Sequence, residues 1–243
     1  MEIGGIKKIS FSDYPGKISC VVFILGCNFR CPWCYFAEYV LPELIRKQPR
    51  IPEKEFFDYL KEKKGLLEAV CISGGEPTIH PELPKFIEKI KNFNLLVKLD
   101  TNGSNPEMLR ELIDKKLVDY ISLDIKAPKE KYSKLIGLFK DGLEGRFLEG
   151  EIIKRIEKSI QILKEGKVDY EFKTTLVPGF LGKEEVLEIV RWIGPAKKYC
   201  LQNFWPEKTI DPRFRKMKPF PLEYLAEIKR IISPFFEICE VLP

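Results

Sequence analysis

The sequence has a single histidine, His80, and this scarcity limits the metal sites that the chain can build. Metal centres made from several imidazoles are excluded, so cysteine is the soft ligand that remains in several copies. No apolar run reaches the roughly 20 residues that a membrane-spanning helix requires. The residues after Met1 lack the long apolar stretch and small-residue cleavage site of a secretory signal. We therefore expect a cytoplasmic protein with no membrane partner.

A strong charge of either sign is also missing. The 243 residues include 41 basic and 36 acidic side chains, which leaves a formal net charge of +5. Lysine and glutamate alternate along the presumed helix faces, so nucleic-acid binding is not indicated. Segment 206–220 is a local exception, with five basic residues against two acidic ones. It is either a solvated loop or a contact surface for a partner or substrate.

Apolar runs alternate with amphipathic stretches along the chain. This pattern predicts an α/β protein, a partial (β/α)6 TIM-like barrel with an N-terminal hairpin around Pro15-Gly16. Strands are expected near Cys20–Leu25, Ala69–Ile72, Leu95–Leu99, Tyr120–Ile125, Tyr170–Leu176 and Tyr199–Gln202. Helices are expected near 53–63, 81–92, 106–116, 151–165, 183–193 and 221–232.

The chain offers no linker that would divide it, so one domain over residues 1–243 is predicted. Within it we expect an N-terminal extension or hairpin (1–16), the barrel (17–205) and a C-terminal cover segment (206–243). The stretch Ala127–Gly150 has four glycines and mixed charge, which predicts a long loop at one rim of the barrel.

Three of the seven cysteines crowd into one short motif, Gly26–Cys34, directly after a predicted strand. Cys27, Cys31 and Cys34 have the spacing that lets one loop direct three thiolates at an iron–sulfur cluster, with one iron of a 4Fe–4S cluster left open. Zinc is an alternative because thiolates bind it too, but it needs a fourth ligand that this region does not offer. The remaining cysteines are isolated and are expected to be small buried residues: Cys20, Cys71, Cys200 and Cys239.

The arrangement C-x3-C-x-aromatic-C, with Trp33 in the aromatic place, resembles the signature of the radical S-adenosylmethionine (SAM) superfamily. Further motifs of this family follow in order: Ser12–Lys17, Ser73–Thr78, Asp100–Gly103, Asp124–Lys126 and Thr174–Pro178. Together they are similar to the activating enzymes of glycyl-radical proteins, above all to those of anaerobic ribonucleotide reductase. Two departures stand out: Tyr35-Phe36 replaces histidine-asparagine of many activators, and Lys173 replaces an arginine of several relatives.

The resemblance implies that the three cysteines hold a 4Fe–4S cluster and that SAM binds beside it. Gly74 and Gly75 would let the backbone approach SAM closely, Glu76 would accept a hydrogen bond from its ammonium group, and Lys126 would pair with its carboxylate. Asp100, Thr101 and Asp124 would gather near this carboxylate around a monovalent cation. The residues expected to contact SAM or this cation are Trp33, Tyr35, Gly74, Gly75, Glu76, Pro77, Asp100, Thr101, Asn102, Asp124, Lys126 and Lys173.

The activity implied by the resemblance is reductive cleavage of SAM to a 5'-deoxyadenosyl radical, which removes hydrogen from a glycine of a partner enzyme. Anaerobic ribonucleotide reductase is the expected partner, and a flavodoxin or ferredoxin-type protein the expected electron donor. Two alternatives remain open. One is a small-molecule radical SAM enzyme, carboxy-deazaguanine synthase-like or nucleoside-modifying, and the other is an inactive iron–sulfur or zinc binding module.

Overall fold

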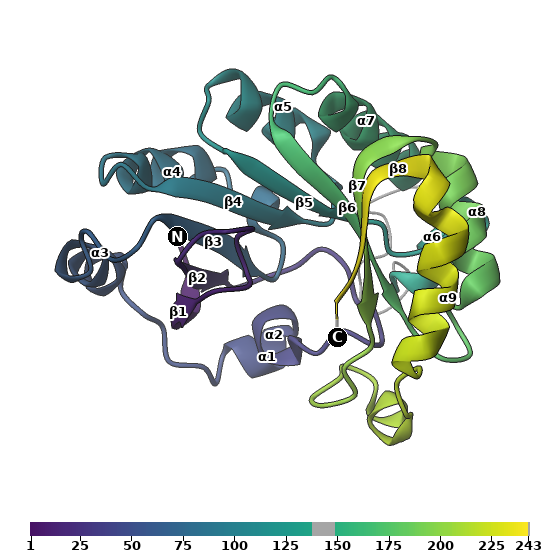
Figure 1. Cartoon of the computed structure of the whole chain (residues 1–243). Helices are drawn as coiled ribbons and strands as arrows, with labels where there is room; N and C mark the ends of the chain where they lie inside the picture. Colours follow the sequence, from purple (N-terminus) through teal and green to yellow (C-terminus); the bar gives the residue numbers. More distant parts are fainter. Residues whose placement is uncertain (138–148, 243) are drawn as a thin grey trace.

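A computed structural model of the chain describes residues 1–137 and 149–242. It contains one eight-stranded sheet in which each strand pairs with its neighbours in chain order (Figure 1). The first pair is antiparallel and every later pair is parallel, which confirms the predicted hairpin and the mostly parallel α/β sheet. The strands are β1 (Ile3–Ser10), β2 (Ser19–Ile24), β3 (Ala69–Gly74), β4 (Leu96–Thr101), β5 (Tyr120–Asp124), β6 (Asp169–Leu176), β7 (Ala196–Asn203) and β8 (Phe236–Leu242).

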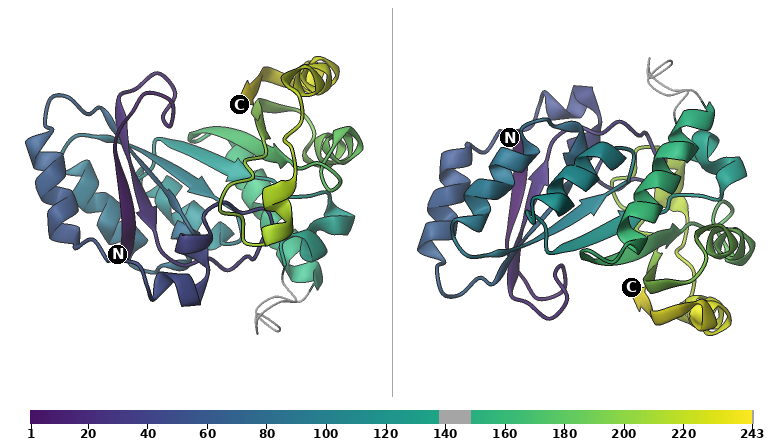
Figure 2. Two further views of the ribbon diagram at one scale, coloured as in Figure 1. Left: turned by 90° about the horizontal axis from the view of Figure 1, so that it is seen from below. Right: turned by 90° about the horizontal axis from the view of Figure 1, so that it is seen from above.

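The longer helices lie on the outer side of this curved sheet (Figures 1 and 2). The six longer ones follow the predicted ranges closely: α3 (Glu53–Glu62), α4 (Leu83–Lys91), α5 (Pro106–Asp114), α7 (Glu149–Lys164), α8 (Lys183–Ile193) and α9 (Leu222–Ile232). Shorter helical turns are α1 (Ala37–Val40), α2 (Pro42–Ile45), α6 (Tyr132–Leu135), η1 (Pro77–Ile79), η2 (Lys129–Lys131), η3 (Pro212–Lys216) and η4 (Ser233–Phe235). Within the described ranges, no helix is long and apolar enough to cross a membrane.

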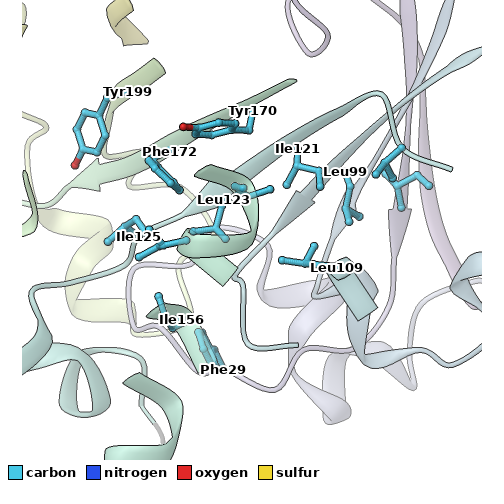
Figure 3. Packing of buried hydrophobic residues seen from close by; sticks show 14 of the residues in the cluster. Phe29, Leu99, Leu109, Ile121, Leu123, Ile125, Ile156, Tyr170, Phe172 and Tyr199 are labelled. Carbon is cyan, nitrogen blue, oxygen red and sulfur yellow. The ribbon is translucent and has the colours of Figure 1, made fainter. Parts of the chain in front are cut away.

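The strands β4 to β6 separate an apolar outer face from a largely polar inner face, because alternate side chains point to opposite sides. On β4 to β6 the outer residues pack under α5 and α7, where Leu123 and Phe172 lie near Leu109 and Ile156 (Figure 3). The alternate positions of the same strands carry Lys98, Asp100, Ser122, Asp124, Glu171 and Lys173. The apolar core therefore lies between sheet and helices, and polar side chains are left on the concave face.

Two predictions need correction. Segment 206–243 does more than cover the barrel, since its last residues form β8 in the sheet and its residues 222–232 form α9. The two glutamates of Phe236–Leu242 point to opposite faces, so this strand lacks the strict alternation that identifies a half-buried strand, and it follows a helix almost directly. The stretch Ala127–Gly150 is not simply a loop, because η2 and α6 fall within it and α7 begins at Glu149. Residues 138–148 of this predicted loop lie outside the described residues.

Candidate active site

The motifs that follow successive strands meet at one cavity of about 390 Å³. Parallel strands end at the same rim of a sheet, so the loops after β2, β3 and β4 are brought together there. All three motif cysteines line the cavity, and so do the other predicted site residues except Pro77. Pro77 is buried as the first residue of η1, where its fixed φ suits the start of a helical turn.

The cysteine loop is anchored by Phe29, which is 2% exposed and reaches into the core beside Ile156 (Figure 3).

Burial raises the pKa of Cys31 to about 12 and also raises the pKa values of Cys27 and Cys34. Without a metal the thiols are therefore protonated at neutral pH, and iron binding has to displace their protons. All seven cysteines of the chain are described and none forms a disulfide.

A closed set of buried hydrogen bonds ties this loop to the loop after β4. The Asn28 amide donates to Ser104 Oγ at 2.8 Å, Asn102 Nδ2 donates to Asn28 Oδ1 at 2.9 Å, and the Ser104 backbone N–H donates to Asn102 Oδ1 at 2.9 Å. Arg30 is also buried, and its Nη1 donates to the carbonyls of Cys27 and Phe29 at 2.8 Å. Asn28, Arg30 and Ser104 were missed from sequence, although polar residues between cluster cysteines were an available signal.

Glu76 is a structural hub rather than a side chain held ready for an ammonium group. It is 1% exposed, and its Oε1 accepts hydrogen bonds from the backbone and hydroxyl of Thr78 and from Thr101 Oγ1. Its Oε2 accepts one from the backbone N–H of Asn102 at 2.6 Å. Glu76 thereby fixes the loop after β3 to the loop after β4, so a role in binding the SAM ammonium stays a prediction.

Gly74 and Gly75 are required by the neighbouring backbone as well as by any ligand. A Cβ at Gly75 would lie 1.9 Å from the carbonyl oxygen of Gly26, and one at Gly74 would lie 2.5 Å from the backbone nitrogen of Ile24. The N–H groups of Gly75 and Glu76 donate to Ile24 and Gly26 at 2.8 Å. The glycine pair therefore allows the ends of β2 and β3 to lie in contact next to the cysteines.

The opposite side of the cavity carries alternating charges. Lys98 Nζ lies 2.9 Å from Asp100, while Asp124 lies 3.1 Å from Lys126 and 3.8 Å from Lys173. Burial alone would raise the pKa of Asp100, but Lys98 and Lys173 hold it below its usual range. Burial alone would lower the pKa of Lys126, but Asp124 and the Cys31 thiol hold it above its usual range. The two carboxylates predicted to surround a cation are thus already neutralised by lysines, and that cation stays a prediction.

The remaining predicted contacts differ in exposure. Trp33 is 4% exposed and packs in the core, whereas Tyr35 is 37% exposed and contacts the ring of Phe36 at the cavity. The C-terminal segment reaches the same loop from outside, where the backbone N–H groups of Ile210 and Asp211 donate to the carbonyls of Cys34 and Pro32 at 3.0 and 2.9 Å.

The family model for the radical SAM superfamily matches residues 21–193, which includes every cysteine of the motif and most of the sheet. The chain belongs to the radical SAM superfamily. It is 34% identical to a Methanocaldococcus jannaschii protein that carries the provisional name of glycyl-radical enzyme activating enzyme, over 97% of this chain and 93% of the relative. A 7-carboxy-7-deazaguanine synthase of Aquifex aeolicus is 33% identical, but over 37% of this chain and 38% of the relative.

Solved structures confirm the radical SAM fold. The crystal structure of Streptococcus suis SuiB bound to precursor peptide SuiA superposes with a TM-score of 0.64 at 14% identity. The match covers 90% of this chain and 47% of SuiB, so the chain spans about half the length of that protein. At this identity the likeness concerns the fold alone.

The cofactors of a radical SAM enzyme are a 4Fe–4S cluster and SAM, and the residues present fit them. Three soft thiol ligands face one cavity and no histidine lines it. Among the residues that the structure describes, no three histidine, cysteine, aspartate or glutamate side chains converge on a single metal ion. When bound and reduced, the cluster supplies the electron that breaks a carbon–sulfur bond of SAM.

Proposed function

We propose that this radical SAM enzyme activates a glycyl-radical enzyme, with anaerobic ribonucleotide reductase as the partner. One electron and SAM give methionine and a 5'-deoxyadenosyl radical. This radical takes a hydrogen atom from the Cα of a partner glycine, which yields 5'-deoxyadenosine and a glycyl radical. The observation that carries the proposal is the 34% identity to the named activating enzyme over nearly the whole chain.

The charge balance of the cavity also supports a neutral substrate over a nucleotide. Four lysines line the cavity, and each lies near a carboxylate that also lines it: Lys7 by Asp13, Lys98 by Asp100, and Lys126 and Lys173 by Asp124. A triphosphate needs uncompensated cations, most often arginine or lysine, to replace its hydration. A glycine within a polypeptide backbone carries no charge, so it needs no uncompensated cation in the cavity. A nucleotide substrate would have to break these pairs.

We also propose a flavodoxin or ferredoxin-type electron donor and a cytoplasmic location, where such donors are found. The sequence left segment 206–220 open as a solvated loop or a contact surface, and we propose the contact surface, which includes Arg213 and Arg215. Both arginines are engaged within the segment, since Arg213 pairs with Asp211 at 2.6 Å and Arg215 donates to the Thr209 carbonyl at 3.0 Å.

Lys216 and Lys218 are better probes of this surface. Both are exposed, and neither makes an ion pair with any residue that the structure describes. Reversing their charge therefore leaves the attachment of the segment to the cysteine loop intact, which reversal of Arg213 or Arg215 would not.

The test uses the reconstituted holoenzyme with dithionite, SAM and anaerobic ribonucleotide reductase. Glycyl radical is measured by electron paramagnetic resonance (EPR), and 5'-deoxyadenosine by chromatography. The proposal predicts a radical on the reductase, and a several-fold higher KM for the reductase in the Lys216→Glu/Lys218→Glu variant. Lys61→Glu/Lys64→Glu, at the end of α3 and in the turn that follows it, is the matched control. SAM cleavage without any protein radical would count against the proposed function.

A further inference from the structure

The cavity wall formed by β6 and β7 carries two polar side chains with no hydrogen-bond partner in the described part of the chain. Thr175 and Gln202 are register partners on these neighbouring strands. Both are half-buried and both line the cavity. Their neighbours Thr174 and Leu201 are fully buried on the other face, and the Thr174 hydroxyl donates there to the Ile125 carbonyl. Thr175 and Gln202 therefore point to the reaction side of the sheet.

Other uncharged polar side chains around the cavity are already engaged. Thr101 donates to Glu76, Asn102 belongs to the ring with Asn28, and Asn203 Nδ2 donates to the carbonyl of Phe220 at 2.8 Å. Ser12 and Tyr35 line the cavity too, but both are exposed to solvent. The half-buried side chains that remain free to hydrogen-bond a ligand are thus Thr175 and Gln202, on the adjacent strands β6 and β7.

The chemistry of this pair fits main-chain amides. A peptide group presents one N–H donor and one C=O acceptor, and a hydroxyl or a carboxamide can both donate and accept. Adjacent strands lie about 4.8 Å apart, so the two side chains can reach neighbouring peptide groups of one extended segment. The lysines nearby are paired with carboxylates, so no free charge competes for the segment.

The pair lies apart from the cysteine, glycine and Asp100–Asn102 motifs, which are at the ends of β2, β3 and β4, whereas Thr175 and Gln202 lie on β6 and β7, near the sheet edge at β8. Thr175 belongs to the Thr174–Pro178 motif and shares its face of β6 with Lys173, and Gln202 lies outside every motif. We infer that Thr175 and Gln202 bind the backbone amides beside the glycine whose hydrogen is removed, an inference that rests on the proposed function. They are specificity residues for an extended peptide segment.

The experiment compares Thr175→Val and Gln202→Met, which keep side-chain size and remove the hydrogen-bonding groups. Gln161→Met, on the exposed face of α7, is the matched control for the amide exchange. The probe is a short capped peptide with the glycine-loop sequence of an anaerobic ribonucleotide reductase and a Cα-dideuterated glycine. Holoenzyme, dithionite and SAM are added, and deuterium in 5'-deoxyadenosine is measured by mass spectrometry. Iron content verifies that each variant is folded and loaded.

Loss of one neutral hydrogen bond should raise the peptide KM about fivefold in each variant, and more in the double variant. The KM for SAM and the peptide-independent cleavage of SAM should not change. A raised KM for SAM with an unchanged peptide KM would overturn the inference and assign the pair to the cofactor. Unchanged values for both would overturn it as well. If the wild-type enzyme cleaves SAM but takes no deuterium from the peptide, the proposed function fails and the inference fails with it.

Discussion

At the scale of single residues, backbone contact decides which side chains the site tolerates. Gly75 shows this most directly, because its missing Cβ faces the Gly26 carbonyl rather than open space. The sequence predicted that this glycine matters, but assigned it to close approach of a ligand. Contact between two strand ends could not be predicted, since it depends on which strands are neighbours.

Gly75→Ala should therefore impair the protein before any cofactor is added. A Cβ placed 1.9 Å from a carbonyl oxygen forces the ends of β2 and β3 apart, which we expect to cost about 3 kcal/mol of unfolding free energy. Urea unfolding of the cluster-free protein measures this. Gly150→Ala is the control, because a Cβ there meets no atom within 4 Å. Equal stability of the two variants would contradict the packing argument.

Lys98 holds two buried carboxylates, at 2.9 Å from Asp100 and 3.9 Å from Glu171. Both acids have a pKa below the usual range, despite burial, chiefly because of Lys98. Because the pKa values of the two acids are lower in the folded than in the unfolded protein, the ionised carboxylates stabilise the fold at pH values above the unfolded pKa of about 4. This stabilisation is lost as the pH falls through the folded-state pKa values.

Lys98→Met should consequently destabilise the cluster-free protein by about 3 kcal/mol at pH 7, because Asp100 loses its nearest cation and Glu171 loses one of its two lysines, the other being Lys198 at 3.4 Å. The difference from wild type should shrink below about pH 4, where the carboxylates take up protons. Urea titrations at both pH values check this. Lys115→Met, which removes an exposed pair with Glu111, should have little effect at either pH. A pH-independent loss in Lys98→Met would show that packing rather than charge is responsible.

At the scale of elements, six of the seven parallel strands and the six long helices could be predicted because each combines a clear hydrophobic period with a start or stop signal. Pro106 after Asn105 is one example, and Asn105 Oδ1 does accept from the Met108 backbone N–H. β8 could not be predicted, because a strand at a sheet edge with charged residues in it has a weak pattern. The short helices α1, α2 and α6 are fixed by tertiary contacts that local sequence does not reveal.

The role of the C-terminal segment in the structure differs most from its role predicted from the sequence. Its Asp211 accepts from the Arg213 backbone N–H at the start of η3, while its own N–H donates to the Pro32 carbonyl. Asp211→Ala should loosen the segment and, with it, the cysteine loop. The loss of a cap is worth about 1 kcal/mol, so we expect roughly fivefold faster loss of iron to a chelator. Glu207→Ala, an exposed residue of the same segment, is the control.

An unchanged rate of iron loss in Asp211→Ala would mean that the buried hydrogen bonds of Asn28 and Arg30 hold the cysteine loop without help from the C-terminal segment. Iron release is followed optically and needs no turnover, so this test does not depend on the identity of the partner.

At the scale of the whole molecule, the structure combines a continuous apolar core on the outside of the sheet with a charged but balanced cavity on its concave side. The cysteine spacing and motif order were enough to predict the cofactors from sequence. The balance of charges was not predictable, because it depends on which lysine lies beside which carboxylate across three strands. That balance is what favours a peptide glycine over a nucleotide as the substrate.

EPR directly tests whether this enzyme activates a glycyl-radical enzyme. The reconstituted enzyme is incubated anaerobically with dithionite, SAM and anaerobic ribonucleotide reductase before the measurement. We expect a protein radical whose hyperfine doublet collapses when the reductase is made with deuterated glycine, and no radical with Cys27→Ala, Cys31→Ala or Cys34→Ala. If SAM is cleaved by a fully loaded cluster while the reductase stays diamagnetic, the assignment as an activator of this partner is contradicted.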